Sequence, residues 1–554
     1  MPCENAAQSN DYFEFIGEYS GVLDYVKEEF NTECITVIDQ RFAIAYVKKN
    51  GRTSIYGQNY PYNTIPRCFG LMDTQMLEDV GVAQVRRSTL DLYGNGVLVG
   101  MIDTGIDYEH PAFRYEDGSS KIYSLWDQTI EGDSEDTFLG YGTEYTKEQI
   151  EEALKSDVPQ QKVPSKDESG HGTFLAGLIA GNEDNETGFS GIAPNAGLIV
   201  VKLRKAKDYL KEYYCIDPKY EAYAETDIML AVHYIDHIAE QLQRPIVIFL
   251  GIGTNLASHL GTGPLDQYLS GRAMLRGVAV VTSAGNEGQA RHHYSGQVSQ
   301  NDAKVEVKVG ESEYGFTMEL WGLAPNRYYV DIESPSGQKT GRIQGGLSGQ
   351  RYVTFLLEKT RLIVEYFTVD TSAGAPVIVM RFQNPAPGIW NIYVSDDGVG
   401  NREFDLWLPI TNFISEDTFF LESTPVAPSN TGLLISCGSY NSNTGSLAID
   451  SSRGFPRNAV KPDFTAPGVE ILGPLPRKRY GRKSGTSVSG AITAGIAALM
   501  LEWGIMQKND MQINTTRIKN YLIRGARRDP ERIYPNREWG YGQVDLYETF
   551  LGIR

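Results

Sequence analysis

A chain of 554 residues is too long for one ordinary hydrophobic core, so its length predicts two or three domains. Hydrophobic residues make up 41% and charged residues 22%, which is the composition of a folded protein rather than of a disordered one. A net charge of −19 argues against nucleic acids and anionic membranes as partners.

The first predicted unit covers residues 11–50. The run YFEFIGEY predicts a strand, GVLDYVKEEF has apolar residues at helical spacing, and ECITVIDQ and RFAIAYVKK predict two more strands. A unit of this size has a marginal core, so we expect it to pack against another surface. Residues 51–66 are polar and rich in turn formers, which predicts a linker.

Strands and helices alternate from Gly96 onward. GVLVGMID predicts a buried strand that ends at Asp103, TFLAGLIAG predicts a buried helix, and GLIVVKLR, PIVIFLG and GVAVVTSAG predict further strands. Residues 226–243 predict a long amphipathic helix with Thr226 as its N-cap. This order predicts an α/β fold, in which helices cover both faces of a parallel sheet and functional residues lie at the carboxyl ends of strands.

A different pattern fills residues 294–428, where eight short runs with alternating apolar residues are separated by Gly, Asn and Pro. This spacing predicts an antiparallel β-sandwich of the jelly-roll type. The α/β pattern then resumes with LLISCGSY, KPDFTAPGVEILGP and the small-residue helix SGTSVSGAITAGIAALMLEWG. We therefore expect the sandwich to be inserted into the larger domain, with boundaries at 1–58, 59–293, 294–428 and 429–554.

The five cysteines are scattered and show no CxxC spacing; they are Cys3, Cys34, Cys68, Cys215 and Cys437. They predict single thiols, and a reducing compartment at synthesis, rather than disulfides or a zinc site. The first residues, MPCENAAQSNDYFEF, lack the basic stretch and apolar run of a signal peptide. No apolar run reaches the roughly 18 residues of a membrane span, so we expect synthesis in the cytoplasm.

Asp103 and His171 stand where acyl-transfer chemistry can use them, since that chemistry needs a nucleophile, a base and a group that orients the base. Asp103 ends the strand in MIDTGID, where its carboxylate can accept an imidazole N–H. His171 lies between Gly170 and Gly172 at the start of a helix. Taken singly, a turn-capping Asp and a packed helix-start His are the commoner interpretations.

Ser487, in SGTSVSGAITAG, is predicted at a helix N-terminus, where backbone N–H groups favour developing negative charge. A capping role fits that motif equally well. Asn286, in SAGNEG, follows a strand and either donates its amide to an oxyanion or forms a turn. His233 and His237 have metal-ligand spacing, but no third ligand accompanies them, so an exposed helix face is the better interpretation.

Taken together, in the order Asp, His, Asn, Ser, the motifs are specific. IDTGID, GHGT, GIAP, AGNEG, GTS and KPDFTAPG closely resemble the subtilase family of serine proteases, over most of residues 85–290 and 430–554. The resemblance implies a subtilisin-like three-layer fold in which Ser487 is the nucleophile and His171 the general base and then acid. It implies that Asp103 orients His171, and that Asn286 and the Ser487 N–H form the oxyanion hole.

The same resemblance implies two walls of a specificity pocket, formed by Phe249, Leu250 and Gly251 and by Ser283, Ala284 and Gly285. The segment after Phe249 would pair with substrate as an added antiparallel strand. The nucleophile helix departs from the family pattern, which has Met-Ala and then Pro-His at the positions of Val488, Ser489, Ala491 and Ile492. None of these four residues takes part in the chemistry.

The segment IPRCFGLMDTQMLEDVGV and the inserted sandwich further resemble the Csp germination proteases of clostridial spores. This implies that residues 1–58 are a prodomain, which stays in the cleft after self-cleavage between Gln58 and Asn59. It also implies a protein substrate, the pro-form of a cortex-lytic enzyme, and a place in the spore. Two alternatives stay open: a general peptide-degrading subtilase, and a non-catalytic regulator whose sandwich recognises a carbohydrate or a partner.

We expect no cofactor. Subtilases often carry calcium, and the loops that contain Asp107, Asp184 and Glu186 are acidic enough to host it. Acidic loops are usually only solvated, so the sequence assigns no metal site.

Overall fold

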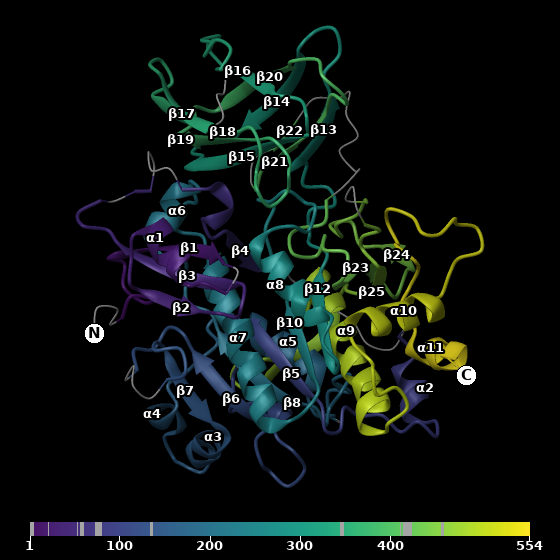
Figure 1. The fold of residues 1–554 in the computed structure, drawn as a ribbon. Coiled ribbons are helices and arrows are strands. Elements are labelled where there is room, and N and C mark those ends of the chain that lie inside the picture. The colour runs from purple at the N-terminus through teal and green to yellow at the C-terminus, as the bar shows by residue number, and fades with distance from the viewer. Residues whose placement is uncertain are drawn as a thin grey trace.

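A computed structural model describes residues 5–19, 21–52, 54–55, 60–71, 80–132, 137–184, 186–343, 348–409, 412–413, 424–455 and 459–553. They form a large α/β body, with a layered β-structure above it and a small N-terminal unit beside it (Figure 1). The functional residues predicted from the sequence lie in the α/β body.

The α/β body is built on a mixed sheet of nine strands in the order β24-β23-β12-β10-β5-β8-β6-β7, with β25 beside β23. The neighbouring pairs are parallel except at the edges, where β7 and β24 run antiparallel to their neighbours. The expected all-parallel sheet is therefore correct for the interior only, because edge strands follow short turns and need no helical crossover. The strands are β5 (Leu98–Asp103), β6 (Ile122–Asp127), β7 (Thr143–Thr146), β8 (Gly197–Lys202), β10 (Ile246–Leu250), β12 (Val278–Ser283), β23 (Ile435–Asn441), β24 (Ser446–Leu447) and β25 (Phe464–Pro467).

Helices cover both faces of this sheet and bury two hydrophobic cores. Helices α5 (His171–Ala180) and α9 (Thr486–Leu501) pack on one face, and α7 (Glu225–Leu242) and α8 (Pro264–Ala273) on the other. Alternate residues of each central strand point to opposite cores, which is why these strands are apolar throughout. The remaining elements of the body are α2 (Val82–Arg86), η3 (Pro111–Phe113), α3 (Lys147–Leu154), α4 (Pro159–Lys162), α6 (Asp208–Tyr213), β26 (Ile471–Leu475), β27 (Arg479–Lys483), η4 (Glu502–Met506), α10 (Thr515–Gly525) and α11 (Leu546–Ile553).

Two helices differ from the sequence-based predictions. Helix α7 begins at Glu225 with Ala224 as its N-cap, so the predicted cap Thr226 is wrong. Thr226 lies in the first turn, and its hydroxyl donates to Glu14 Oε2 at 2.8 Å. The helical stretch Thr486–Met506 is long and apolar enough to span a membrane by composition, but 89% of its most apolar window is buried inside the protein, as in a core helix.

Residues 293–413 form two antiparallel sheets, with strand orders β13-β21-β15-β19-β18-β17 and β16-β20-β14-β22. Side chains from both sheets share one core that includes Phe316, Phe382 and Trp390. Each of the eight predicted strand runs coincides with a strand. The strands are β13 (His293–Gln297), β14 (Ala303–Val309), β15 (Gly315–Gly322), β16 (Tyr328–Glu333), β17 (Ser348–Phe355), β18 (Thr360–Phe367), β19 (Val377–Gln383), β20 (Gly388–Asp396), β21 (Glu403–Trp407) and β22 (Asn412–Phe413).

The N-terminal unit contains β1 (Tyr12–Glu18), α1 (Asp24–Phe30), β2 (Ile35–Val37) and β3 (Phe42–Lys48), in a sheet of order β1-β3-β2. Its side chains join a hydrophobic cluster that we call the shared core, because α6 and the two-sheet region contribute to it as well. This cluster shows how a unit with a marginal core of its own is stabilised. Its members include Phe13, Phe15, Phe30, Ile55, Tyr62, Ile65, Tyr209, Tyr213, Trp321, Val379 and Trp407.

The cysteines are not all single thiols. Cys215 and Cys437 are buried free thiols, whereas Cys34 takes part in a disulfide. The expectation of no disulfide is therefore wrong for Cys34, because spacing along the chain does not report which thiols meet in space. Burial raises the pKa of the Cys437 thiol to about 12, so this cysteine is a packing residue and not a reactive one.

Candidate active site

The structure brings Asp103, His171 and Ser487 together from three separate elements. Asp103 is the last residue of β5, His171 the first of α5, and Ser487 the second of α9. His171 Nδ1 lies 2.7 Å from Asp103 Oδ1, and its Nε2 lies 3.4 Å from Ser487 Oγ. The imidazole thus connects a hydroxyl to a carboxylate, which is the arrangement that acyl transfer needs.

All three residues are almost fully buried, with relative exposures of 1%, 3% and 0%. Asp103 Oδ1 also accepts the backbone N–H of Thr104 at 2.8 Å. This second bond fixes the carboxylate plane, so the carboxylate selects the His171 tautomer that carries its proton on Nδ1. That tautomer leaves Nε2 as the basic nitrogen that faces Ser487.

Asp167 is a site residue that the sequence-based reasoning missed. Its Oδ1 accepts from the Thr104 hydroxyl and the Gly170 N–H, each at 2.8 Å. Its Oδ2 accepts from the N–H and hydroxyl of Thr173 at 2.8 and 2.7 Å. Asp167 therefore ties the start of the His171 helix to the strand end that carries Asp103. An acidic residue four positions before a Gly-flanked histidine was the available signal.

Asn286 and Ser487 are linked through Thr486. The Asn286 Oδ1 accepts the Thr486 N–H at 2.9 Å, and the Thr486 hydroxyl accepts the Gly285 N–H at 3.0 Å. A backbone N–H can only donate, so the amide oxygen of Asn286 is the atom that faces it. The amide nitrogen is therefore the donating end, as an oxyanion hole beside the Ser487 N–H requires.

The residues expected to form two pocket walls have different surroundings. Ser283 ends β12, and Ala284 and Gly285 follow it beside the start of α9. Phe249 and Leu250 lie inside β10 with 0% exposure, and their side chains enter the two opposite cores. Only Gly251 of that set approaches the triad, since a Cβ added there would come within 3.4 Å of Asp103 Oδ2.

The unusual residues of the nucleophile helix do not interrupt it, because α9 runs unbroken from Thr486 to Leu501. The Ser489 hydroxyl donates to the carbonyl oxygens of Ala466 and Pro467 at 3.1 and 3.0 Å. Close packing explains the small residues, since a Cβ on Gly490 would lie 2.4 Å from Ser283 Oγ. The helix is thereby held against the loop that carries Asn286.

Other predicted residues lie apart from this site. Asp107 accepts the backbone N–H of Arg477 at 2.7 Å, and Asp184 accepts that of Glu186 at 3.0 Å, so both carboxylates complete local turns. His237 stacks on Phe138 at 3.8 Å. Among the residues that the structure describes, no group of three or more His, Cys, Asp or Glu side chains is placed to hold a metal ion. Gln58 and Asn59 lie outside the described residues.

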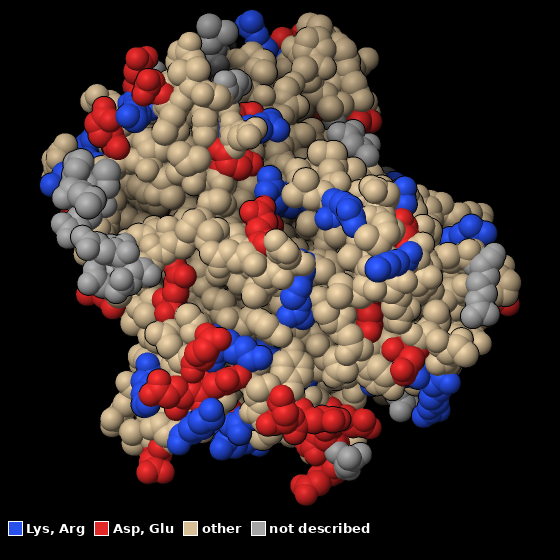
Figure 2. All heavy atoms as spheres, turned by 60° about the horizontal axis from the view of Figure 1, so that its bottom comes forward, with Lys and Arg blue, Asp and Glu red and all other residues tan. Residues whose placement is uncertain are grey.

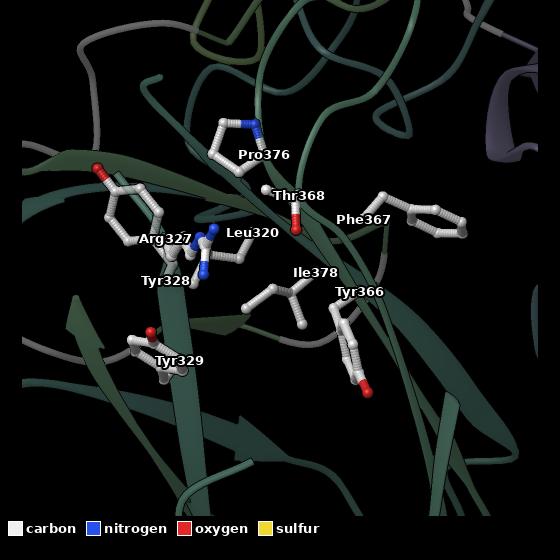
Figure 3. Close-up of a pocket in the computed structure, with 9 residues that line it drawn as sticks. All are labelled: Leu320, Arg327, Tyr328, Tyr329, Tyr366, Phe367, Thr368, Pro376 and Ile378. Carbon is white, nitrogen blue, oxygen red and sulfur yellow. The ribbon is translucent and has the colours of Figure 1, made fainter. Parts of the chain in front are cut away.

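Two surface features bear on possible ligands. On the face shown in Figure 2, acidic and basic side chains are interspersed along the lower edge. A hollow in the two-sheet region is lined partly by aromatic residues, Tyr328, Tyr329, Tyr366 and Phe367 (Figure 3). Its volume of about 20 Å³ holds roughly one water molecule and is too small for a sugar ring.

Comparison with known proteins places these residues in a family context. The model of the subtilase family matches residues 94–311 and 400–542. The chain is 23% identical over 499 residues to C5a peptidase of Streptococcus pyogenes, covering 82% of this chain and 39% of that protein. It is 23% identical to the minor extracellular protease Vpr of Bacillus subtilis, covering 76% of this chain and 48% of Vpr. The chain thus spans less than half the length of these curated relatives.

Among solved structures, the chain resembles the CspB protease of Clostridium perfringens. The TM-score is 0.76 and the sequence identity 29%. The match covers 85% of this chain and 97% of that one. The similarity therefore extends through the two-sheet region as well as the α/β body.

Proposed function

Because the chain belongs to the subtilase family of serine endopeptidases, we propose that it hydrolyses peptide bonds through Asp103, His171 and Ser487. Ser487 Oγ attacks the peptide carbonyl while His171 Nε2 takes its proton, and His171 then gives that proton to the leaving amine. Asp103 holds the ring in position and stabilises the imidazolium. Asn286 and the Ser487 N–H bind the oxyanion.

The single observation that carries this proposal is the continuous contact from Ser487 through His171 to Asp103. A fluorophosphonate probe tests it, because such probes react only with an activated serine. We expect the wild-type protein to be labelled and Ser487→Ala to be unlabelled. Ser489→Ala is the matched control, since Ser489 bonds to backbone carbonyls on the same helix and should keep the labelling. Equal labelling of wild type and Ser487→Ala would contradict the proposal, and would favour a non-catalytic regulator.

We also propose that the N-terminal unit acts as a prodomain and that the two-sheet region is an inserted jelly roll within residues 294–428. Both packing partners of the prodomain support this, because the shared core joins it to α6 and to the two sheets. A buried ion pair adds to the contact, since Glu14 Oε1 lies 2.5 Å from Arg204 and 2.7 Å from Lys207. These contacts favour a prodomain that stays bound after it has been cut.

For the physiological role, we propose activation of a cortex-lytic pro-enzyme during spore germination, with the protein held in the spore. The similarity to a CspB protease and the two-sheet region that both chains share support this role. We propose a protein substrate and no cofactor. Detection of the protein in spores, and loss of pro-enzyme cleavage in a Ser487→Ala strain, would support it. Detection in growing cells only would favour a general peptide-degrading subtilase.

A further inference from the structure

The strand β4 (Cys68–Leu71) lies between β9 (Tyr223–Ala224) and β11 (Ile252–Gly253), and it pairs antiparallel with both. Neighbouring strands are about 4.8 Å apart, so β9 and β11 stand two strand spacings from one another. They form a slot for one extended chain. Such a slot binds peptides through the backbone, whatever their side chains, and this chain fills it with its own residues.

The slot leads to the triad. Leu250 lies opposite Ile102, which brings the next residue, Gly251, beside Asp103. Because Gly251 directly precedes β11, the slot begins at the catalytic carboxylate. On the other side of the slot, burial raises the pKa of Tyr223, and the charges of Glu221 and Asp103 raise it further, so β9 also lies near Asp103.

The direction of β4 is that of a substrate approaching its scissile bond. Gly70 lies opposite Gly253 and Leu71 opposite Ile252. In an antiparallel pair one strand's numbers rise as the other's fall, so the chain that leaves Leu71 heads towards Gly251 and the triad. Residues 68–71 therefore stand on the side of the slot that holds the acyl part of a substrate.

The bond expected from the sequence, Gln58–Asn59, has described neighbours that belong elsewhere. On one side Ile55 is buried in the shared core. On the other, the Tyr60 ring lies 4.1 Å from that of Phe15, and the Tyr62 hydroxyl donates to Glu319 of β15. The described residues on both sides of that bond thus pack with the N-terminal unit and the two sheets, and not with the triad.

We propose that Cys68–Leu71 is the chain's own substrate strand, and that the self-cleaved bond lies C-terminal to Leu71 rather than at Gln58–Asn59. This rests on the proposed protease function. Ser487 Oγ forms an ester with the carbonyl carbon of the scissile peptide as the peptide C–N bond breaks, and His171 passes the hydroxyl proton to the leaving amine. Water then cleaves the ester, which leaves a carboxylate on the N-terminal fragment and restores Ser487.

This placement explains why the prodomain would remain after the cut. The N-terminal fragment would keep β4, whose backbone is paired on both edges, together with the shared-core contacts of the N-terminal unit. As long as β4 stays in place, no other extended peptide can enter the slot. The cut fragment is then a product inhibitor that must be displaced before a protein substrate binds.

The test is to purify the full chain and Ser487→Ala, and to determine intact masses and the N-terminal sequence of the large fragment. We expect Ser487→Ala to be full length, and the wild-type large fragment to begin after residue 71. A large fragment that begins at Asn59, or anywhere before Cys68, would overturn the inference and leave the proposed protease function standing. A full-length wild type that a fluorophosphonate labels would overturn self-cleavage alone, and one that is not labelled would overturn both.

Two proline variants test the strand itself, because proline removes one backbone N–H. Gly70→Pro should slow self-cleavage about tenfold or more, the effect of losing a backbone hydrogen bond to β11 or β9. Gln58→Pro, the matched control, should leave the cut and its position unchanged. Circular dichroism of both variants in the Ser487→Ala background verifies folding. Blocked cleavage in Gln58→Pro, with normal cleavage in Gly70→Pro, would refute the assignment.

Discussion

The backbone N–H of Thr486 donates to Asn286 Oδ1 at 2.9 Å, and this bond turns the amide nitrogen of Asn286 into the donating end beside the nucleophile. Thr486 directly precedes Ser487, so the donor and the nucleophile are positioned by adjacent residues of one helix. A displacement of α9 would move both together, which preserves their geometry. The oxyanion hole is in this sense built before substrate arrives, as electrostatic stabilisation requires.

Replacing Asn286 by Ala should lower kcat about 10²–10³-fold with little change in KM, because the amide stabilises charge that appears only in the transition state. Single-turnover cleavage of a peptide substrate measures this. Asn286→Asp is the informative companion, since it keeps an acceptor for the Thr486 N–H but replaces the donor by a negative charge. Its kcat should fall at least as far; near-normal activity of Asn286→Asp would exclude a role as oxyanion donor.

Asp167→Asn should lower kcat about tenfold, again with little effect on KM. One of the two carboxylate oxygens would become an amine, which cannot accept the N–H and hydroxyl groups that now surround Asp167. The helix that begins at His171 would then lose its tie to Thr104. Glu168→Gln is the control, because its side chain is 73% exposed, and kcat should change less than about twofold. A rise in KM at constant kcat would contradict this positioning role.

The sequence was sufficient for residues whose role follows from a local junction. Asp103 at a strand end, and His171 and Ser487 at helix starts, were found because strands and helices have strong periodicities and the junctions fall between them. The edge strands of the sheet and the cap of α7 were missed, since tertiary contacts decide them. Thr226 has the chemistry of a cap, but Glu14, more than two hundred residues away, takes its hydroxyl.

Contacts across long sequence separations explain the other corrections. Phe249 and Leu250 looked like a pocket wall, yet adjacent strand residues point to opposite faces, and both faces of this sheet are covered. The disulfide of Cys34 and the tie of Asp167 to Thr104 leave no periodic trace in the sequence. The slot that holds β4 is formed by β9 and β11, which are only two residues long and too short for any pattern to predict.

Glu14→Gln should weaken the docking of the N-terminal unit by about 3–5 kcal/mol, because it leaves the charges of Arg204 and Lys207 buried without their partner. Burial alone would raise the pKa of Glu14, but Lys207 and Arg204 lower it to about 2, so the group is ionised at neutral pH. After self-cleavage, the wild-type fragment should co-elute with the catalytic chain in size-exclusion chromatography, and the variant fragment should separate from it.

Glu18→Gln is the matched control for this experiment. Glu18 lies on the same strand, but its side chain is 48% exposed and it pairs with an exposed Arg41 at 2.7 Å. Exposed pairs contribute about 0–1 kcal/mol, so this variant should retain its fragment like the wild type. Equal retention by Glu14→Gln and Glu18→Gln would show that the buried pair does not hold the two parts together.

Lys461 should make the stability of the protein rise with pH. Its side chain is fully buried, donates to the Leu434 carbonyl and to Asp463 Oδ2 at 2.8 Å each, and lies near Lys519, which also pairs with Asp463. Burial lowers the pKa of Lys461 to about 7 in spite of the opposing charge of Asp463. Between about pH 7 and the ordinary lysine pKa of 10.5, the unfolded chain therefore binds more protons than the folded one.

The unfolding free energy of the wild type should consequently increase relative to Lys461→Met over that window, by up to about 1.4 kcal/mol per pH unit. Thermal unfolding at pH 7, 8 and 9, in the Ser487→Ala background to prevent self-digestion, measures the difference in Tm. Lys205→Met serves as the reference, because that lysine is 68% exposed and should show no trend. If the Tm difference between wild type and Lys461→Met stayed constant with pH, the buried lysine would have to be charged throughout the window.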